Sequence, residues 1–147
     1  MKILLAVDDS KFSEAAIQAV ISQARPADTE VRVLHVLEAP SHLAGVEMVE
    51  YDAEFEGLWK ALREQAKALV EKAIGKLRDV GFSVTPSLED GDPKSKIIDV
   101  ATEWKADLIV LGSHGRKGLE RFFMGSVADS VARHAACSVE IVRLPSA

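Results

Sequence analysis

The sequence predicts an α/β fold: an open, doubly wound parallel sheet of five strands with helices on both faces. Two observations lead to this prediction. Short apolar runs, such as ILLAV at 3–7 and LIVL at 108–111, are typical of strands that are covered on both faces. Between such runs, apolar residues recur every three or four positions, which is the spacing of amphipathic helices.

The first strand is expected at Ile3–Val7, and the turn-forming residues DDS at 8–10 end it. A helix follows over 13–24 and stops before Pro26, because proline disfavours helical geometry in the residue that precedes it. A second strand is expected at Val31–Leu37, which is β-branched and mostly apolar.

Residues 38–57 have no clean period and are interpreted as a long loop with some helix. Apolar residues recur at helical spacing over 58–77, and Gly81 stands where a glycine C-cap belongs. The third strand is expected at Phe82–Leu88. Pro86 cannot donate a ladder hydrogen bond, so either this strand lies at an edge of the sheet or the proline ends it.

Asp92-Pro93 combines a favourable N-cap with proline at the first helical position, and a helix is expected to follow. The fourth strand is the LIVL run. After the next connection Ser126 begins a helix, and Val139–Val142 supplies the fifth strand. We see no repeat and no linker, so the 147 residues are expected to form a single domain, 1–147.

Composition excludes several classes of protein. A net charge of −5 argues against broad binding to nucleic acid or to anionic membranes, both of which depend on clustered positive charge. No apolar stretch is long enough to span a bilayer. Cys137 is the only cysteine, so no intrachain disulfide can form, and a cytoplasmic location is expected.

The connection LGSHGRKGLERFFMGS at 111–126 has the composition of an anion site. It carries four glycines and three basic residues against one glutamate, a local charge of +2. Glycines permit positive φ angles and close approach of the backbone to a ligand, and successive N–H groups can form a concave anion site. Gly125-Ser126 adds the amino end of a helix, which favours phosphate.

Simpler readings stay open at this point. Ser126 can serve only as an N-cap, and Asp8 and Asp9 can simply cap the first helix. The sequence contains neither the P-loop pattern GxxxxGK[ST] nor GxGxxG after the first strand.

The spacing Gly112-x2-Gly115-x9-Gly125-Ser126 resembles the ATP-binding pattern of the universal stress protein family. The segments ILLAVDDS, VLHV, EDGDP and ADLIVLGSHG resemble that family at matching places, so the resemblance covers essentially the whole chain. It implies a Rossmann-like domain with strand order 3-2-1-4-5. In that order the third strand lies at an edge, and the ends of the first and fourth strands share one crevice.

The resemblance also implies a site for ATP, possibly with Mg²⁺. Adenine would lie near Ala6, Val7 and the backbone of Val36, and Asp8 or Asp9 near the ribose or a phosphate-bound Mg²⁺, with Asp9 as the candidate metal ligand. The phosphates would be held by backbone and side-chain groups from two short segments. The implied residues are Ser10 in the first turn, and Gly112, Ser113, His114, Gly115, Arg116, Gly125, Ser126 and Val127.

Catalysis is not expected from the sequence. His114 beside phosphates more often donates a hydrogen bond than transfers a proton, and no base–nucleophile pair is visible around it. His35 is interpreted as a histidine of the core or packed against a helix. His42 and His134 lack metal-ligand spacing with Cys137, and Cys137 is interpreted as a small buried hydrophobe.

Family members commonly form dimers through the fifth strand, so a homodimer through Val139–Val142 is expected. Here Glu140 stands where an apolar residue is common, and it would face the mate's strand or a helix. Three functions follow as hypotheses: a nucleotide-dependent stress-response protein, a nucleotide-independent interaction module of the same fold, and a slow ATPase.

Overall fold

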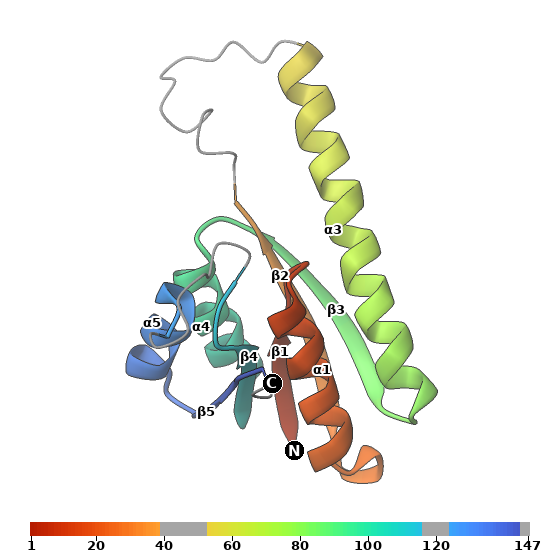
Figure 1. Cartoon of the computed structure of the whole chain (residues 1–147), viewed down its shortest axis with the longest axis vertical. Helices are drawn as coiled ribbons and strands as arrows, with labels where there is room; N and C mark the ends of the chain where they lie inside the picture. Colours follow the sequence, from red (N-terminus) through yellow and green to blue (C-terminus); the bar gives the residue numbers. More distant parts are fainter. Residues whose placement is uncertain (39–52, 116–123, 145–147) are drawn as a thin grey trace.

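A computed structural model of the chain describes residues 1–38, 53–115 and 124–144. Five strands form one sheet in the order β3-β2-β1-β4-β5, with every neighbouring pair parallel (Figure 1). Both the predicted fold class and the strand order are therefore confirmed. The strands are β1 Lys2–Ala6, β2 Glu30–Leu37, β3 Ser83–Asp90, β4 Leu108–Gly112 and β5 Ser138–Val142.

Helices cover both faces of the sheet, and each face has its own core. On one face, α1 (Lys11–Gln23) and α3 (Ala53–Asp79) pack over Ile3, Leu5 and Val33. On the other, α4 (Pro93–Trp104) and α5 (Ser126–His134) pack over Leu4, Leu34 and Ile109. Alternate residues of β1 and β2 pack into opposite cores, which explains the unbroken apolar run at Ile3–Ala6 and the mostly apolar sequence of β2. A short 3₁₀ turn, Pro26–Asp28, joins α1 to β2.

The longest helix begins earlier than the sequence indicates. α3 starts at Ala53, so residues 53–57 are the helical part of the segment that we interpreted as a long loop with some helix, and 39–52 lie outside the described residues. Glu54 and Glu56 in its first turn complement the positive end of the helix dipole. The amino-terminal end of α3 extends beyond the sheet (Figure 1), so its first turn has no core to pack against and no apolar spacing that marks it as helix.

The predicted carboxyl end of α3 and the predicted start of α4 are confirmed in position, but the capping contact expected at α4 is absent. Gly81 after α3 has a φ of 102°, as a glycine cap requires, and Pro86 lies within β3 at an edge of the sheet. Asp92 is the N-cap of α4 but its side chain makes no capping hydrogen bond. α4 ends on Lys105, which has left-handed geometry (φ 59°, ψ 50°) without being glycine.

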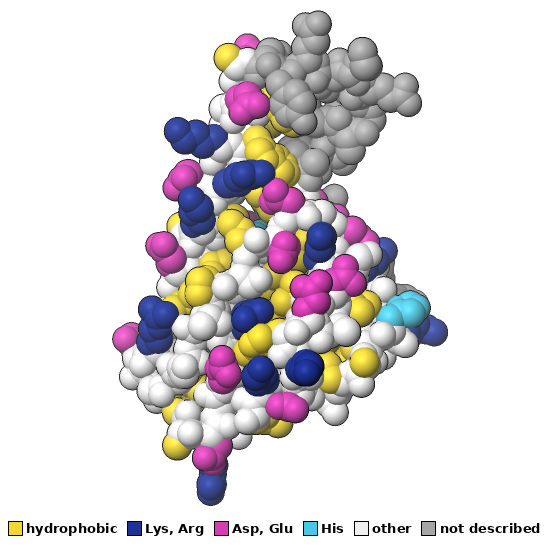
Figure 2. Space-filling model, turned by 180° about the vertical axis from the view of Figure 1, so that it is seen from behind, with side chains coloured by type: hydrophobic (Ala, Val, Ile, Leu, Met, Phe, Trp, Pro, Cys, Tyr) yellow, Lys and Arg dark blue, Asp and Glu magenta, His cyan; other side chains and the backbone are white. Residues whose placement is uncertain are grey.

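The surface carries charges of both signs. In Figure 2, Lys and Arg side chains are interspersed with Asp and Glu on the face shown. No helix in the described part of the chain is long and apolar enough to cross a membrane.

Leu77→Ala should lower the free energy of unfolding by about 2–5 kcal/mol, because it leaves a cavity where the helix meets the sheet. Leu77 is fully buried in the core beneath α3. Leu58→Ala on the same helix is the matched control: that side chain is 39% exposed, so its loss should cost at most about 1 kcal/mol. Urea denaturation of both variants measures the difference, and equal losses would contradict the assigned core.

Candidate functional site

The candidate site lies at the carboxyl ends of β1 and β4, where the strand order reverses. β1 leads into α1 on one face of the sheet and β4 leads towards α5 on the other, so the two connections diverge from neighbouring strands. In open parallel sheets, ligands bind in the crevice that such a divergence creates.

Asp8 holds the turn between β1 and α1 through a closed set of hydrogen bonds. Its Oδ1 accepts from the Ser10 amide and from Ser13 Oγ, both at 2.9 Å. The Asp8 amide in turn donates to Ser13 Oγ at 2.7 Å. The cap of α1 is Ser10, whose Oγ accepts from the Ser13 amide at 3.3 Å. The reading of Asp8 and Asp9 as helix caps is therefore wrong: Asp8 braces the turn before the cap, and Asp9 is exposed.

Two glycines of the predicted set are required by close contacts within the protein. A Cβ on Gly112 would lie 2.6 Å from Phe12 Cβ and 2.9 Å from the Phe12 carbonyl carbon. A Cβ on Gly125 would lie 2.9 Å from the Ser113 carbonyl oxygen. Among the described glycines only Gly81 and Gly91 have positive φ. The expected use of positive φ in this connection is thus wrong for its described glycines, and close approach is the reason for glycine.

Gly115 brings the two connections together. A Cβ on Gly115 would lie 3.0 Å from Asp8 Oδ2, the carboxylate oxygen that is not used in the turn. The turn after β1 and the connection after β4 therefore face one another across Asp8 and Gly115, as the strand order implies.

A backbone hydrogen bond joins the two described ends of the connection after β4. The Gly125 amide donates to the Ser113 carbonyl at 2.7 Å, and the Ser113 amide donates to the Val142 carbonyl at 2.8 Å. The Gly125 N–H is consequently occupied and does not point a free donor at a ligand. Gly125 is the N-cap of α5 and Ser126 its first residue, so the reading of Ser126 as the cap is wrong. The first N–H groups of the helix, at Ser126 and Val127, have no partner within it.

Ser113 and His114 are held by neighbouring side chains. Ser113 is 4% exposed, and its Oγ lies 3.1 Å from His114 Nδ1. The imidazole of His114 also stacks at a tilt on Phe12, with ring centroids 5.1 Å apart. A hydroxyl and an imidazole thus do form a pair, which the sequence did not indicate, but the burial of Ser113 keeps this hydroxyl from an external substrate.

The residues expected to surround the adenine base of ATP pack on opposite faces of the sheet. Ala6 and Val36 pack with the core under α4 and α5, whereas Val7 belongs to the core under α1 and α3. Val7 also lines a cavity of about 180 Å³ between α1 and α3, together with Asp8, Asp9 and Ser10. His35 ties the strand ends together, since its Nδ1 donates to the Val7 carbonyl at 2.7 Å.

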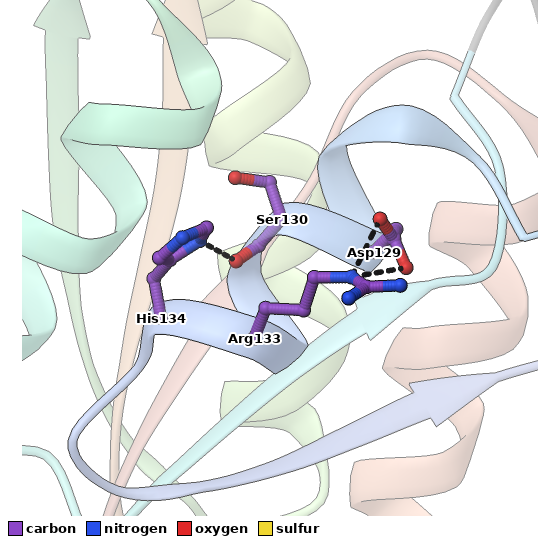
Figure 3. Close-up of polar contacts among 4 residues, drawn as sticks. All are labelled: Asp129, Ser130, Arg133 and His134. Atoms are coloured by element: carbon purple, nitrogen blue, oxygen red, sulfur yellow. Dashed lines mark hydrogen bonds and ion pairs between the residues drawn. The ribbon is translucent and has the colours of Figure 1, made fainter.

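The basic part of the predicted site, Arg116, Lys117 and Arg121, lies outside the described residues. The described helix that follows has its own polar contacts (Figure 3). Arg133 Nε donates to both carboxylate oxygens of Asp129 at 3.1 Å, and His134 Nδ1 donates to the Ser130 carbonyl at 2.8 Å. The His134 side chain thus folds back onto the last turn of α5.

The described residues contain no group of three or more His, Cys, Asp or Glu that could hold a metal ion. Burial raises the pKa of the Cys137 thiol, with Asp107 adding to the increase. A raised pKa disfavours the reactive thiolate.

Sequence reasoning missed two residues of the site. Phe12 fills the space that Gly112 leaves and supports His114, while Ser13 completes the turn around Asp8. The spacing Asp8-x-Ser10-x2-Ser13 is a detectable signal for the turn, because short polar side chains at these offsets bond nearby backbone groups. Phe12 gives no comparable signal.

The sequence model of the universal stress protein family matches residues 1–143. A universal stress protein of Methanocaldococcus jannaschii is 32% identical over 148 residues, covering 98% of this chain and 82% of that protein. The solved structure of universal stress protein UspA from Lactobacillus plantarum is 26% identical, covers 97% of each chain and superposes with a TM-score of 0.84. A universal stress protein from Archaeoglobus fulgidus, solved in complex with dAMP, is 26% identical with a TM-score of 0.68, again covering 97% of each chain.

Gly112→Ala should destabilise the protein by about 1–3 kcal/mol, because the new methyl group overlaps the backbone of Phe12 and one of the two segments must move. Gly75→Ala is the opposite control: nothing lies within 4 Å of its Cβ position inside α3, so alanine should stabilise the helix by roughly 0.5–1 kcal/mol. Thermal and urea unfolding report both changes. A neutral Gly112→Ala would remove close packing as the reason for this glycine.

Proposed function

The chain belongs to the universal stress protein family, and from that premise we propose that it binds an adenine nucleotide at the carboxyl ends of β1 and β4. The approach of Asp8 to Gly115 carries the proposal, because it brings the turn after β1 and the connection after β4 into one crevice. Both segments are of kinds that bind ligands. One is a braced polar turn, and the other, joined to the same connection, is the amino end of α5, whose first N–H groups have no partner within the helix.

The phosphates would be held by the N–H groups of Ser126 and Val127, with the Ser126 hydroxyl as an additional donor. Helix amino ends stabilise anions through both donors and dipole. His114, positioned by Phe12 and Ser113, would add a donor beside them. The Gly125 amide is left out of this arrangement because Ser113 occupies it.

The adenosine part would lie across the ends of β1 and β2. Ala6 and Val36 supply apolar surface on one side, and the Asp8 carboxylate oxygen that faces Gly115 is placed to accept from a ribose hydroxyl. The dAMP complex of the Archaeoglobus fulgidus relative supports the choice of an adenine nucleotide. We propose ATP as the ligand, with a phosphate-bound Mg²⁺ near the exposed Asp9, in a cytoplasmic regulatory protein.

One observation favours a second candidate, a nucleotide-independent interaction module. The glycine spacing first pointed to ATP, yet Gly112 and Gly125 are each required by contacts within the protein itself. A chain of this fold would therefore keep these two glycines with or without a ligand. Binding measurements, and not the glycine spacing alone, separate the two candidates.

We further propose a homodimer formed by antiparallel pairing of β5. β5 is an edge strand, and the hydrogen bond from Ser113 to the Val142 carbonyl shows which of its residues face β4. Backbone groups alternate along a strand, so those of Val139 and Ile141 face outward and are available to a partner. Glu140 points to α1, where the Gln23 amide lies 2.7 Å from its Oε1, so its charge does not obstruct the edge.

Ser126→Pro tests the phosphate site, because it removes one N–H and the hydroxyl at a helix position where proline is tolerated. Gly125 before it is extended (φ −62°, ψ 155°), which is compatible with a following proline. Affinity for ATP and AMP, measured by calorimetry with and without Mg²⁺, should fall about tenfold or more. Ser126→Ala, which keeps the N–H, should lose less. Wild-type protein that binds neither nucleotide would favour the interaction module.

Ile141→Pro tests the dimer, since proline removes an outward N–H without removing a hydrogen bond to β4. Ile141→Ala is the matched control that shortens the side chain and keeps the N–H. Analytical ultracentrifugation should show a dimer for wild type and for the alanine variant, and a shift towards monomer for the proline variant. A monomeric wild type would contradict the proposed dimer.

A further inference from the structure

The second edge of the sheet is the longer one. β3 has eight residues against five in β5, and among the described strands it pairs only with β2. A long edge strand presents unpaired N–H and C=O groups that can template pairing with another chain. A molecule with two such edges could add copies at both and would form open chains of sheets instead of a closed pair.

The residues of β3 that face outward follow from one hydrogen bond. The Gly91 amide donates to the Leu37 carbonyl of β2 at 3.0 Å, so odd-numbered residues at this end of β3 turn to β2. Because the backbone groups alternate, Val84, Pro86, Leu88 and Asp90 present theirs to the outside.

Each of the first two of these outward positions lacks one of the two backbone groups that a full ladder needs. Arg78 Nη2, from the end of α3, donates to the Val84 carbonyl at 3.0 Å and occupies the acceptor that an added strand would need. Pro86, the next outward residue, has no N–H to offer. The two interruptions are adjacent on the outer side, so an added strand would lose consecutive bonds of its ladder.

A charged pair lies at the other end of the same edge. Arg63 Nη2, also from α3, contacts Asp90 Oδ2 at 2.8 Å, and both side chains are about half exposed. α3 thus contributes an arginine near each end of β3. Charged side chains on an edge disfavour pairing, because an added strand would have to displace or desolvate them.

α3 does not pack tightly along the whole of β3, so close packing of this helix is not what would keep the edge unpaired. A recess of about 510 Å³ lies between α3 and β3, lined by apolar groups that include Val70, Ile74, Pro86 and Leu88. A strand that approached the edge of β3 would meet one occupied acceptor, one missing donor and a terminal ion pair.

We propose that Arg78 and Pro86 close the outer edge of β3 to a second copy of this chain, which leaves β5 as the pairing edge and limits assembly to a closed pair. The closure depends on the occupied carbonyl of Val84 and on the missing N–H of Pro86. It does not depend on the nucleotide site, and it rests on the proposed β5 dimer only for the size of the wild-type assembly.

The test is the double variant Arg78→Ala/Pro86→Thr, which frees the Val84 carbonyl and restores an outward N–H in a β-branched residue. Sedimentation velocity at rising protein concentration should show species of at least about twice the wild-type mass. Circular dichroism and thermal unfolding confirm that the variant is folded. Pro86→Thr alone keeps the Arg78 contact, so it should show a smaller increase in mass. This single variant replaces the double variant if the latter is unstable.

Leu88→Pro added to the double variant is the matched rescue. Residue 88 also faces outward, so the new proline removes an outward donor and leaves the ladder with β2 intact. The wild-type mass should return, which simple destabilisation would not produce. Folded double and single variants that keep the wild-type mass at every concentration would overturn the proposal. A monomeric wild type would contradict the proposed β5 dimer but not the closure of β3, because the double variant should then still form dimers through the opened β3 edge.

Discussion

The contact between Gly112 and Phe12 is the constraint on which the site depends. β4 ends with its backbone against the first turn of α1, at a separation that leaves no space for a side chain. This approach sets the position of the connection after β4 relative to the turn after β1. Without it, Gly115 would not reach Asp8, and the crevice between the two connections would be wider.

The side chains around this contact are also closely packed. Phe12 packs against Gly112 through its backbone and Cβ while its ring supports His114. Ser13, the next residue, is buried and accepts from the Asp8 amide. The first turn of α1 is thus both the end of a structural helix and one wall of the site. Substitutions there would change stability and ligand geometry together.

Most of the fold could be predicted because its signals are local. Strands buried on both faces have continuous apolar sequences, and Gly81 and Pro86 have few structural alternatives at their positions. The start of α3 could not be predicted because its first residues extend past the sheet, and the left-handed Lys105 carries no sequence signal. At the site, the participating segments were predictable. The use of Asp8 as a brace and of the Gly125 amide as an internal donor was not, because both depend on distances between segments.

The hydrogen bond from Gly125 to Ser113 fixes where the connection after β4 starts and ends, independently of what lies between. The amino end of α5 is therefore tied to the end of β4. In general, doubling the number of residues in a loop raises the free-energy cost of closing it by only about 0.6 kcal/mol. Natural variation in length and charge can accumulate in that connection while the helix amino end stays in place. Relatives could in this way acquire different recognition surfaces beside an unchanged binding crevice.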